Sequence, residues 1–322
     1  MSVKNARILG TGSYLPLNMV SNNDLSKIVD TDDEWIFTRS GIRNRHFAAD
    51  TQTTSDLAYE ASIKALDASN VSPNELGGII VATTTPDLTF PSTATILQAK
   101  LGIDTTCMAF DIQAVCSGFV YALATANGFF KAGIDKPILV VGAEKMSSLL
   151  DFSDRTTCVL FGDGAGAVVL GATDDNTDGI LSTHIHADGR HCDLLKVNGG
   201  VSSSGEVGKL TMEGREVFKF AVDAMAGAVR EAMEQNNLGA DQVDWLVPHQ
   251  ANIRIIEATA KKLGMTMDKV VTTLENQGNT SAASIPLALD HAVKSGDVKR
   301  GQTLLLEAMG GGFTWGAALV RY

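Results

Sequence analysis

The sequence has few of the features that mark exported, membrane-bound or metal-binding proteins. It contains four cysteines and seven prolines in 322 residues, and no two cysteines are spaced as a zinc site requires. No run of about 18 apolar residues occurs, so we expect no membrane span. The first residues lack the charged head, apolar stretch and cleavage site of a signal peptide. We therefore expect a cytoplasmic protein whose thiols are free.

Positive charge is also scarce, with 26 Lys and Arg against 37 Asp and Glu, a net charge of −11 at pH 7. This balance argues against nucleic acid as a ligand, because nucleic-acid binding depends on neutralising phosphates. An acidic partner would have to meet a local basic patch. The apolar share of 44% is that of a globular protein with a sizeable core, and the length fits two domains or two similar halves.

Short strand-like runs alternate with helical stretches, and the same order occurs twice. The strand-like runs lie at 77–84, 108–115, 137–141 and 164–170, and again at 245–250, 269–274, 302–306 and 315–320. A long helical stretch precedes each set, at roughly 54–69 and 214–236. Any α/β protein alternates in this way, but a tandem duplication also explains the matching spacing. We predict an α/β fold of two similar halves, 1–172 and 173–322.

Two strand-to-helix junctions correspond in this repeat. The helical stretch after Cys116 stops near Gly133 and the one after Asn279 stops near Gly296, an interval of 17 residues in each case. We therefore expect Cys116 and Asn279 to lie at equivalent helix starts that meet in the middle of the molecule.

Cys116 lies in D-I-Q-A-V-C-S-G-F, where an apolar strand ends and a helix begins. The unpaired N–H groups of a first helical turn carry partial positive charge, so a thiolate there is stabilised and its pKa is lowered. The alternative is a buried, inert thiol. Cys107, Cys158 and Cys192 lack this setting, and we interpret them as packing residues.

Polar partners for a nucleophilic cysteine lie in the second half. His249 follows an apolar strand in W-L-V-P-H-Q, and Asn279 begins a helix in G-N-T-S-A-A-S. Asn279 also suits simple helix capping. Three glycines at 310–312 let backbone N–H groups approach a ligand, as an oxyanion hole requires. The alternative is a tight hairpin, for which three glycines are more than needed.

Two other chemistries fit parts of this pattern less well. His184, His186 and His191 lie close together, but no carboxylate-rich stretch accompanies them as a metal site would need. The order Cys, His, Asn and the interval of 133 residues from Cys116 to His249 also fit papain-like proteases. The sequence around Cys116 is not theirs, and the duplicated α/β pattern does not suit that fold.

Seven segments together carry a resemblance that runs essentially end to end. They are G-T-G-S-Y-L-P (10–16), D-E-W-I-F-T-R-S-G-I-R (33–43), A-V-C-S-G-F (114–119), F-G-D-G-A-G-A (161–167), V-P-H-Q-A-N-I-R (247–254), G-N-T-S-A-A-S-I-P (278–286) and G-G-G-F-T-W-G (310–316). On these segments the sequence resembles the 3-oxoacyl-[acyl-carrier-protein] synthase III family of thiolase-fold condensing enzymes.

The resemblance implies a five-layered α-β-α-β-α fold, a homodimer, and a catalytic triad of Cys116, His249 and Asn279. Cys116 would accept an acyl group from acyl-CoA, and His249 and Asn279 would stabilise the enolate formed when malonyl-acyl carrier protein loses CO₂. The resemblance also implies an oxyanion hole formed by the N–H groups of Cys116 and Gly311. It implies no metal or redox cofactor, since coenzyme A arrives as the thioester substrate.

Further binding residues follow from the same resemblance. Trp35 and Arg155 would sandwich the adenine of coenzyme A, and Arg39 and Asn252 would lie along its phosphate and pantetheine arm. Phe90 would limit the acyl pocket from the partner subunit of a dimer. From the residues alone, Trp35 is a half-buried aromatic side chain and Phe90 is a core residue.

A candidate docking patch for the acidic carrier protein lies on one predicted helix. Arg254, Lys261 and Lys262 are spaced at i, i+7 and i+8, on one helical face, and Lys219 could join them. An ordinary solvated face is the alternative. The primer's chain length stays open, as do two other functions: a family relative that makes a signalling molecule or polyketide, and a non-catalytic carrier-protein binder.

Overall fold

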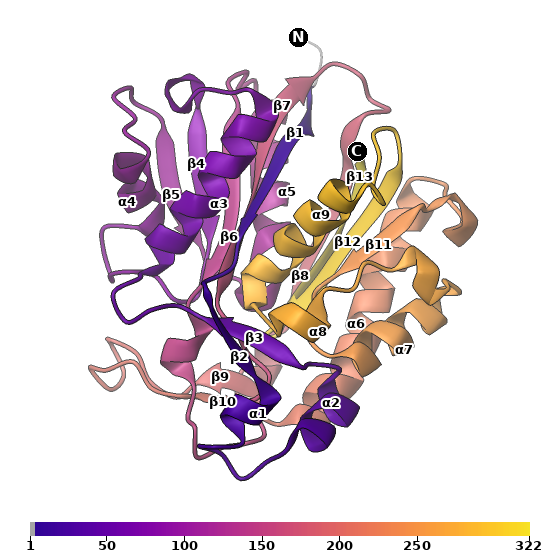
Figure 1. Ribbon diagram of the computed structural model, residues 1–322. Helices are drawn as coiled ribbons and strands as arrows, with labels where there is room; N and C mark the ends of the chain where they lie inside the picture. The colour runs from indigo at the N-terminus through magenta and orange to yellow at the C-terminus, as the bar shows by residue number, and fades with distance from the viewer. Residues whose placement is uncertain (1–3) are drawn as a thin grey trace.

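The computed structural model describes residues 4–322 and contains two large β-sheets that lie side by side (Figure 1). The first sheet has the order β1-β7-β6-β4-β5, and the second has the order β8-β13-β12-β11. The strands of the first are β1 (Asn5–Tyr14), β7 (Gly164–Thr173), β6 (Ile138–Glu144), β4 (Gly78–Ala82) and β5 (Met108–Ile112). Those of the second are β8 (Gly179–Ala187), β13 (Thr314–Arg321), β12 (Thr303–Gly310) and β11 (Trp245–Pro248).

Helices cover the outer faces of both sheets and fill the space between them. α3 (Thr54–Ser69) and α4 (Thr93–Lys100) pack on the outer face of the first sheet. α5 (Gly118–Lys131) and α9 (Ser284–Ser295) lie between the sheets, and α6 (Gly214–Gln235) and α7 (Ile253–Leu263) cover the second sheet. The predicted five-layered α-β-α-β-α fold is therefore confirmed.

The sequence of each layer reflects its burial. α5 reads G-F-V-Y-A-L-A-T-A-N-G-F-F-K and is apolar on several sides because both sheets pack against it. β4 and β6 are parallel neighbours, wholly buried, and they read as unbroken apolar runs rather than as alternating ones. α7 begins at its N-cap Asn252, whose side-chain oxygen accepts the Arg254 N–H at 2.9 Å.

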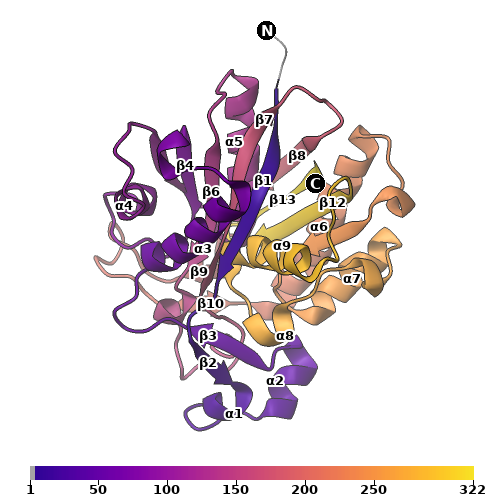
Figure 2. The ribbon, with the colours of Figure 1, turned by 45° about the horizontal axis from the view of Figure 1, so that its top comes forward.

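The remaining elements are short, and several gather at one end of the two sheets (Figure 2). There α1 (Asn22–Leu25) and α2 (Asp33–Ser40) accompany two small antiparallel sheets, β2 (Asn18–Ser21) with β3 (Asn44–Phe47) and β9 (Leu195–Val197) with β10 (Leu210–Met212). A short α8 (Leu274–Gln277) precedes α9. The single-turn 3₁₀ helices are η1 (Pro73–Glu75), η2 (Val115–Ser117), η3 (Met146–Leu149), η4 (Gly189–His191), η5 (Ala240–Gln242), η6 (Met267–Lys269) and η7 (Ser281–Ala283). Within residues 4–322, no helix has the length and apolar character needed to cross a bilayer.

The two sheets repeat one topology. β1, β7, β6 and β4 occupy the places that β8, β13, β12 and β11 occupy in the second sheet, with the same parallel and antiparallel pairings. The counterpart of β5 is missing as a strand. The prediction of a strand over 269–274 is wrong, because this segment forms η6, the start of α8 and a single bridge between Leu246 and Val270.

The junctions before α5 and α9 also correspond, but not in the predicted register. η2 and η7 each begin with a left-handed residue, Val115 (φ 47°) and Ser281 (φ 49°), and each is followed by its helix three residues later. Cys116 therefore corresponds to Ala282, and Asn279 lies three positions earlier than predicted. The equal intervals of 17 residues misled because α9 has 12 residues and α5 has 14.

Candidate active site

Cys116 is the middle residue of η2, between β5 and α5, and its exposed fraction is 4%. Its backbone N–H makes no hydrogen bond to another residue within 4–322. Gly310, the last residue of β12, lies so close that a Cβ atom there would be 2.6 Å from the Cys116 nitrogen. The glycine is thus required for the glycine-rich turn to approach the backbone of Cys116.

Burial raises the pKa of the Cys116 thiol to about 12, and the charge of Glu144 adds to the rise. A hydrogen bond with the Ser281 side chain opposes it. The prediction that the helix start lowers the pKa of this thiol is wrong, because desolvation outweighs the helix terminus. At neutral pH Cys116 is therefore a thiol, and it becomes a nucleophile only when it loses its proton.

Glu144, at the end of β6, is a wholly buried carboxylate next to this thiol. It accepts hydrogen bonds from three consecutive threonines after β4, including the Thr85 hydroxyl at 2.7 Å and the Thr84 N–H at 3.0 Å. Ser281 of η7 donates its hydroxyl to Glu144 at 3.1 Å. Burial raises the pKa of Glu144, and these donors oppose that rise. Glu144 thus joins β4, β6 and η7 behind Cys116.

His249 follows β11 and is 2% exposed. Its backbone N–H donates to the Glu307 carbonyl on β12 at 2.8 Å, and its Nδ1 lies 2.6 Å from the Ser284 hydroxyl. Burial lowers the pKa of His249 to about 3, so the imidazole is neutral at physiological pH. Nε2 makes no hydrogen bond within residues 4–322 and remains available to a ligand.

Asn279 is held by its backbone and by one side-chain atom. Its N–H donates to the Leu160 carbonyl at 2.9 Å and its carbonyl accepts the Gly162 N–H at 3.0 Å. Its Oδ1 accepts the Ser281 N–H at 2.9 Å. This fixes the orientation of the amide and leaves the two N–H bonds of Nδ2 without an acceptor among residues 4–322. Asn279 therefore caps η7 and also presents a donor.

One short segment, residues 281–284, links the three predicted triad residues. Ser281 contacts the Cys116 thiol through its side chain and the Asn279 amide through its N–H, and Ser284 contacts His249. The three side chains are all buried, with exposed fractions of 6% or less. The structure therefore brings together the cysteine of one half and the histidine and amide of the other.

The glycine-rich turn between β12 and β13 is fixed at its far end. Phe313 exchanges two backbone hydrogen bonds with Asp188, at 2.8 and 2.9 Å, and stacks on His191 with ring centroids 5.2 Å apart. Near Cys116, the Thr314 hydroxyl donates to the Ala114 carbonyl at 2.9 Å. The Gly311 N–H has no acceptor among residues 4–322. This turn can therefore present a free N–H beside that of Cys116.

The three histidines considered for a metal site make other contacts. His184 and His186 lie on one face of β8, because side chains two positions apart in a strand point to the same side, and both contact the Glu231 carboxylate of α6, at 3.2 and 2.7 Å. Trp315 stacks on His186. Within residues 4–322 no three His, Cys, Asp or Glu side chains are arranged to hold a metal ion.

The residues predicted to bind coenzyme A form one cluster at the end of the molecule that carries α2. The guanidinium groups of Arg39 and Arg155 lie 4.6 and 5.0 Å from the centroid of the Trp35 ring. Asn252 donates its Nδ2–H to the Arg39 carbonyl at 2.8 Å, which joins α7 to α2. Trp35 and Arg155 are in direct contact, so one of them must move before a base can stack between them.

Phe90 lies in the loop between β4 and α4 with 83% of its side chain exposed. The prediction from the residues alone that it is a core residue is therefore wrong. The loop is anchored by Asp87, which accepts the Ser55 N–H at 2.8 Å. An exposed phenylalanine on an anchored loop is available to another chain.

The predicted docking residues lie on two packed helices, Lys219 on α6 and the other three on α7. Lys262 forms an ion pair with Asp223, and Lys219 pairs with Glu216 at 3.0 Å. Arg254 lies over the ring of Phe218, at 5.8 Å. Local acidic groups thus neutralise two of the four positive charges, while Arg254 and Lys261 make no ion pair within residues 4–322.

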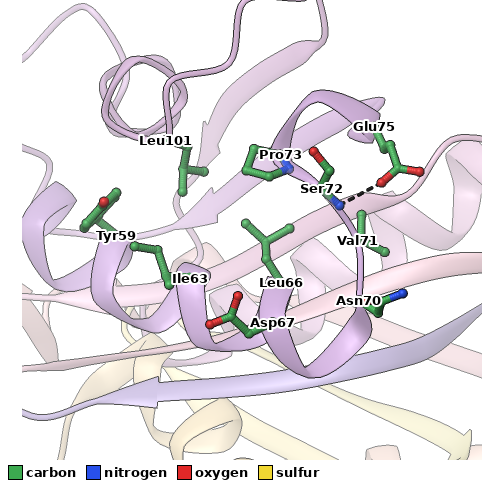
Figure 3. A pocket seen from close by; sticks show the side chains of 10 residues that line it. All are labelled: Tyr59, Ile63, Leu66, Asp67, Asn70, Val71, Ser72, Pro73, Glu75 and Leu101. Carbon is green, nitrogen blue, oxygen red and sulfur yellow. Dashed lines mark hydrogen bonds between the residues drawn. The ribbon is translucent and has the colours of Figure 1, made fainter.

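A cavity of about 520 Å³ lies elsewhere (Figure 3). It is formed by the C-terminal half of α3, the turn around η1 and Leu101 after α4. Its only acidic groups are Asp67 and Glu75, and none of the predicted site residues lines it. The cavity belongs to the outer helical layer and not to the chemistry described above.

Sequence reasoning missed the residues that hold the site in place. Ser281, Ser284 and Gln250 lie in segments quoted for the resemblance, but no role was predicted for them or for Glu144. Gln250 accepts the N–H groups after η6 and donates to two carbonyls, so it fixes the backbone that follows His249. The hydroxyls at 281 and 284 in G-N-T-S-A-A-S were a usable signal, because buried hydroxyls need partners.

Sequence comparisons match the chain to one enzyme family. The family model described as 3-Oxoacyl-[acyl-carrier-protein (ACP)] synthase III matches residues 110–189, and the model of the C-terminal part of that synthase matches residues 233–322. The beta-ketoacyl-[acyl-carrier-protein] synthase III of Xylella fastidiosa is 60% identical over 321 residues, 98% of each chain.

Solved structures agree over nearly the whole length. The 3-oxoacyl-[acyl-carrier-protein] synthase III of Aquifex aeolicus superimposes with a TM-score of 0.94 at 49% identity, covering 98% of this chain and 100% of that one. The priming β-ketosynthase of the R1128 polyketide pathway gives a TM-score of 0.93 at 36% identity, covering 99% and 96%.

Proposed function

The chain belongs to the 3-oxoacyl-[acyl-carrier-protein] synthase III family, and from this premise we propose that Cys116, His249 and Asn279 are its catalytic residues. The enzyme is an acyltransferase that starts fatty acid synthesis by decarboxylative condensation of an acyl-CoA primer with malonyl-acyl carrier protein. The observation that carries the proposal is the convergence of all three side chains on residues 281–284.

In the first stage, the Cys116 sulfur loses its proton and attacks the thioester carbonyl of the acyl-CoA. The oxyanion is held by the N–H groups of Cys116 and Gly311, two donors without partners among residues 4–322. The carbon–sulfur bond to coenzyme A breaks, its sulfur takes a proton, and an acyl-cysteine remains.

In the second stage, malonyl-acyl carrier protein binds with its thioester oxygen between His249 Nε2 and Asn279 Nδ2. These neutral donors stabilise the enolate that forms as CO₂ leaves, and the carbanion attacks the acyl-cysteine to release the 3-oxoacyl product. A neutral histidine suits this role, because it donates a hydrogen bond without adding charge. The reaction draws its electron pair from the departing carboxylate, and we propose that it needs no cofactor.

Binding roles are proposed on weaker support. The Trp35, Arg39, Arg155 and Asn252 cluster would hold coenzyme A, and the exposed Phe90 would reach the acyl pocket of a second subunit in a homodimer. Lys219, Arg254, Lys261 and Lys262 would dock the carrier protein. We also propose 1–172 and 173–322 as the two repeats, and the cytoplasm as the location.

A polyketide role for the same chemistry is the second candidate. The likeness to the R1128 priming ketosynthase supports it, although its identity of 36% is lower than the 49% of the Aquifex aeolicus synthase. The two roles differ in the primer that Cys116 accepts.

Intact-protein mass spectrometry after incubation with a panel of acyl-CoAs tests the function. We expect the mass of one acyl group on the wild-type protein and none on Cys116→Ala, with acetyl-CoA among the good donors. Preference for a long or branched primer would favour the second candidate. Acylation of Cys116→Ala would contradict the assignment of the nucleophile.

A further inference from the structure

We propose that the Ser284 hydroxyl is a positioning group that holds His249 in the tautomer with its proton on Nε2. The proposal rests on the function proposed above, because that function needs an Nε2–H to donate to the malonyl thioester oxygen. Ser284 touches no reacting atom in this account and acts only through the imidazole.

The contact between the two side chains is short and dry. Ser284 is the first residue of α9 and His249 follows β11, and their exposed fractions are 1% and 2%. The hydroxyl oxygen and Nδ1 are 2.6 Å apart. Two buried polar atoms at this distance share one proton in a hydrogen bond, and its direction decides which ring nitrogen is protonated.

The surroundings of the hydroxyl give the direction. The Gln250 N–H points at the Ser284 oxygen from 3.4 Å, so this oxygen already has a donor. If Nδ1–H were also a donor, the hydroxyl proton would have no acceptor among residues 4–322, since Nδ1 is the one acceptor within its reach. If the hydroxyl instead donates to Nδ1, both groups are paired. Buried polar groups are nearly always paired, which favours Nε2–H.

The duplication supplies an independent comparison. The parallel pair β4 and β6 of the first half matches the parallel pair β11 and β12 of the second. At the start of each pair an equivalent backbone hydrogen bond forms, from the Gly77 N–H to the Pro137 carbonyl at 2.8 Å and from the Asp244 N–H to the Thr303 carbonyl at 3.0 Å. These two equivalent bonds show which residues of β4 and β11 correspond. The residues five positions after the two donors therefore correspond, and in the second half that residue is His249.

In the first half the corresponding residues at the end of the strand and at the start of the helix also approach each other, but neither has a polar side chain. The counterparts of His249 and Ser284 are Ala82 and Gly118, the first residue of α5. A Cβ on Gly118 would lie 3.2 Å from the Ala82 Cβ, so the pair is also in contact there. The hydroxyl occurs only in the half that carries the imidazole, as expected if its purpose is the imidazole and not the helix start.

Two half-reactions measured on Ser284→Ala test the proposal. We expect acyl-enzyme formation from acetyl-CoA at the wild-type rate, because Cys116 is untouched. We expect kcat for CO₂ release from malonyl-acyl carrier protein to fall by about 10- to 100-fold, with KM unchanged. Ser62→Ala is the matched control: Ser62 is equally buried in α3 and donates to the Ala58 carbonyl at 2.6 Å. It should change neither half-reaction.

Nitrogen-15 NMR of the histidine rings provides a readout that does not depend on a variant folding. The wild-type His249 should show a proton on Nε2 and an accepted hydrogen bond on Nδ1. A proton on Nδ1 in the wild-type protein overturns the proposal, and so does decarboxylation by Ser284→Ala at the wild-type rate. Equal losses in both half-reactions would show a merely structural serine and also overturn it.

His249→Ala separates a failure of this inference from a failure of the proposed function. If His249→Ala loses CO₂ release and Ser284→Ala does not, only the role of Ser284 is wrong. If His249→Ala releases CO₂ normally, the proposed function of the imidazole is wrong as well.

Discussion

The two halves of the molecule share a topology and differ in their polar groups. The first half has Cys116 where the second has Ala282, and the second half has His249 where the first has Ala82. Each half thus carries a small apolar residue at the position where the other carries a candidate catalytic residue. Under the proposed function, the first half serves acyl transfer and the second half donates hydrogen bonds.

The largest effect expected from breaking this division is in Asn279→Ala. The substitution removes a donor from the enolate and should slow malonyl decarboxylation by about 10²–10³-fold. Acyl transfer from acetyl-CoA, which depends on the first half, should be unchanged. Radiolabelled CO₂ release and acyl-enzyme mass measure the two steps separately. Equal loss in both steps would mean that Asn279 acts only as the cap of η7.

The two steps should also differ in pH dependence. Because the pKa of Cys116 is raised to about 12, the thiolate fraction and the rate of iodoacetamide alkylation at Cys116 should rise about tenfold per pH unit between about pH 7 and pH 9. Because the pKa of His249 is lowered to about 3, the rate of decarboxylation by Cys116→Ala should not change with pH over the same range. Peptide mass mapping measures the alkylation. A plateau below pH 8 would show that an acylation-competent thiolate exists at rest.

A buried carboxyl in the second half sharpens the comparison further. Glu307 on β12 corresponds to Val141 on β6, and both of its carboxyl oxygens lack partners within residues 4–322. Burial raises the pKa of Glu307 to about 8. In the unfolded chain Glu307 ionises near pH 4.3, whereas in the folded protein it keeps its proton up to about pH 8. The free energy of unfolding therefore falls as the pH rises between these two values, by about 1.4 kcal/mol per pH unit.

Glu307→Gln should remove this slope. Urea unfolding between about pH 5 and pH 8 measures it, with the exposed Glu60→Gln of α3 as the control. A slope that Glu307→Gln leaves unchanged would contradict the raised pKa of Glu307.

The smallest expected effect concerns the surface of the second half. Charge reversal at Arg254 and Lys261, which make no ion pair within residues 4–322, should raise KM for malonyl-acyl carrier protein about three- to tenfold at low salt and spare acyl-CoA. Lys131→Glu on α5 is the control. An unchanged KM would leave these residues as an ordinary solvated face.

Much of the fold could be predicted because several strands in each half are apolar runs in the sequence. β4, β6, β11 and β12 form at the apolar stretches that predicted them, such as G-G-I-I-V-A. Because these strands are buried on both faces, their sequences do not alternate between polar and apolar residues. Cys116 and His249 were candidates because each follows such a run, and Asn279 was a candidate because it precedes a helix. The counterpart of β5 could not be predicted, since V-V-T-T-L reads as a strand and only packing decides that it makes one bridge.

The support of the site could not be predicted from the sequence. The contacts of Glu144 with Ser281 and of His249 with Ser284 join residues 137 and 35 positions apart, and no local pattern specifies them. The prediction of a lowered pKa for the Cys116 thiol was wrong for a related reason. A helix terminus is visible in sequence, whereas the desolvation that outweighs it depends on β12 and η7 closing over Cys116.

The division of labour between the halves is tested most directly by measuring both half-reactions on Cys116→Ala and His249→Ala. The account predicts that His249→Ala gains the acyl mass from acetyl-CoA but releases almost no CO₂ from malonyl-acyl carrier protein. It predicts that Cys116→Ala releases CO₂ and gains no acyl mass. If either substitution abolishes both reactions in a protein that remains folded, the two steps are not assigned to separate halves and the account is contradicted.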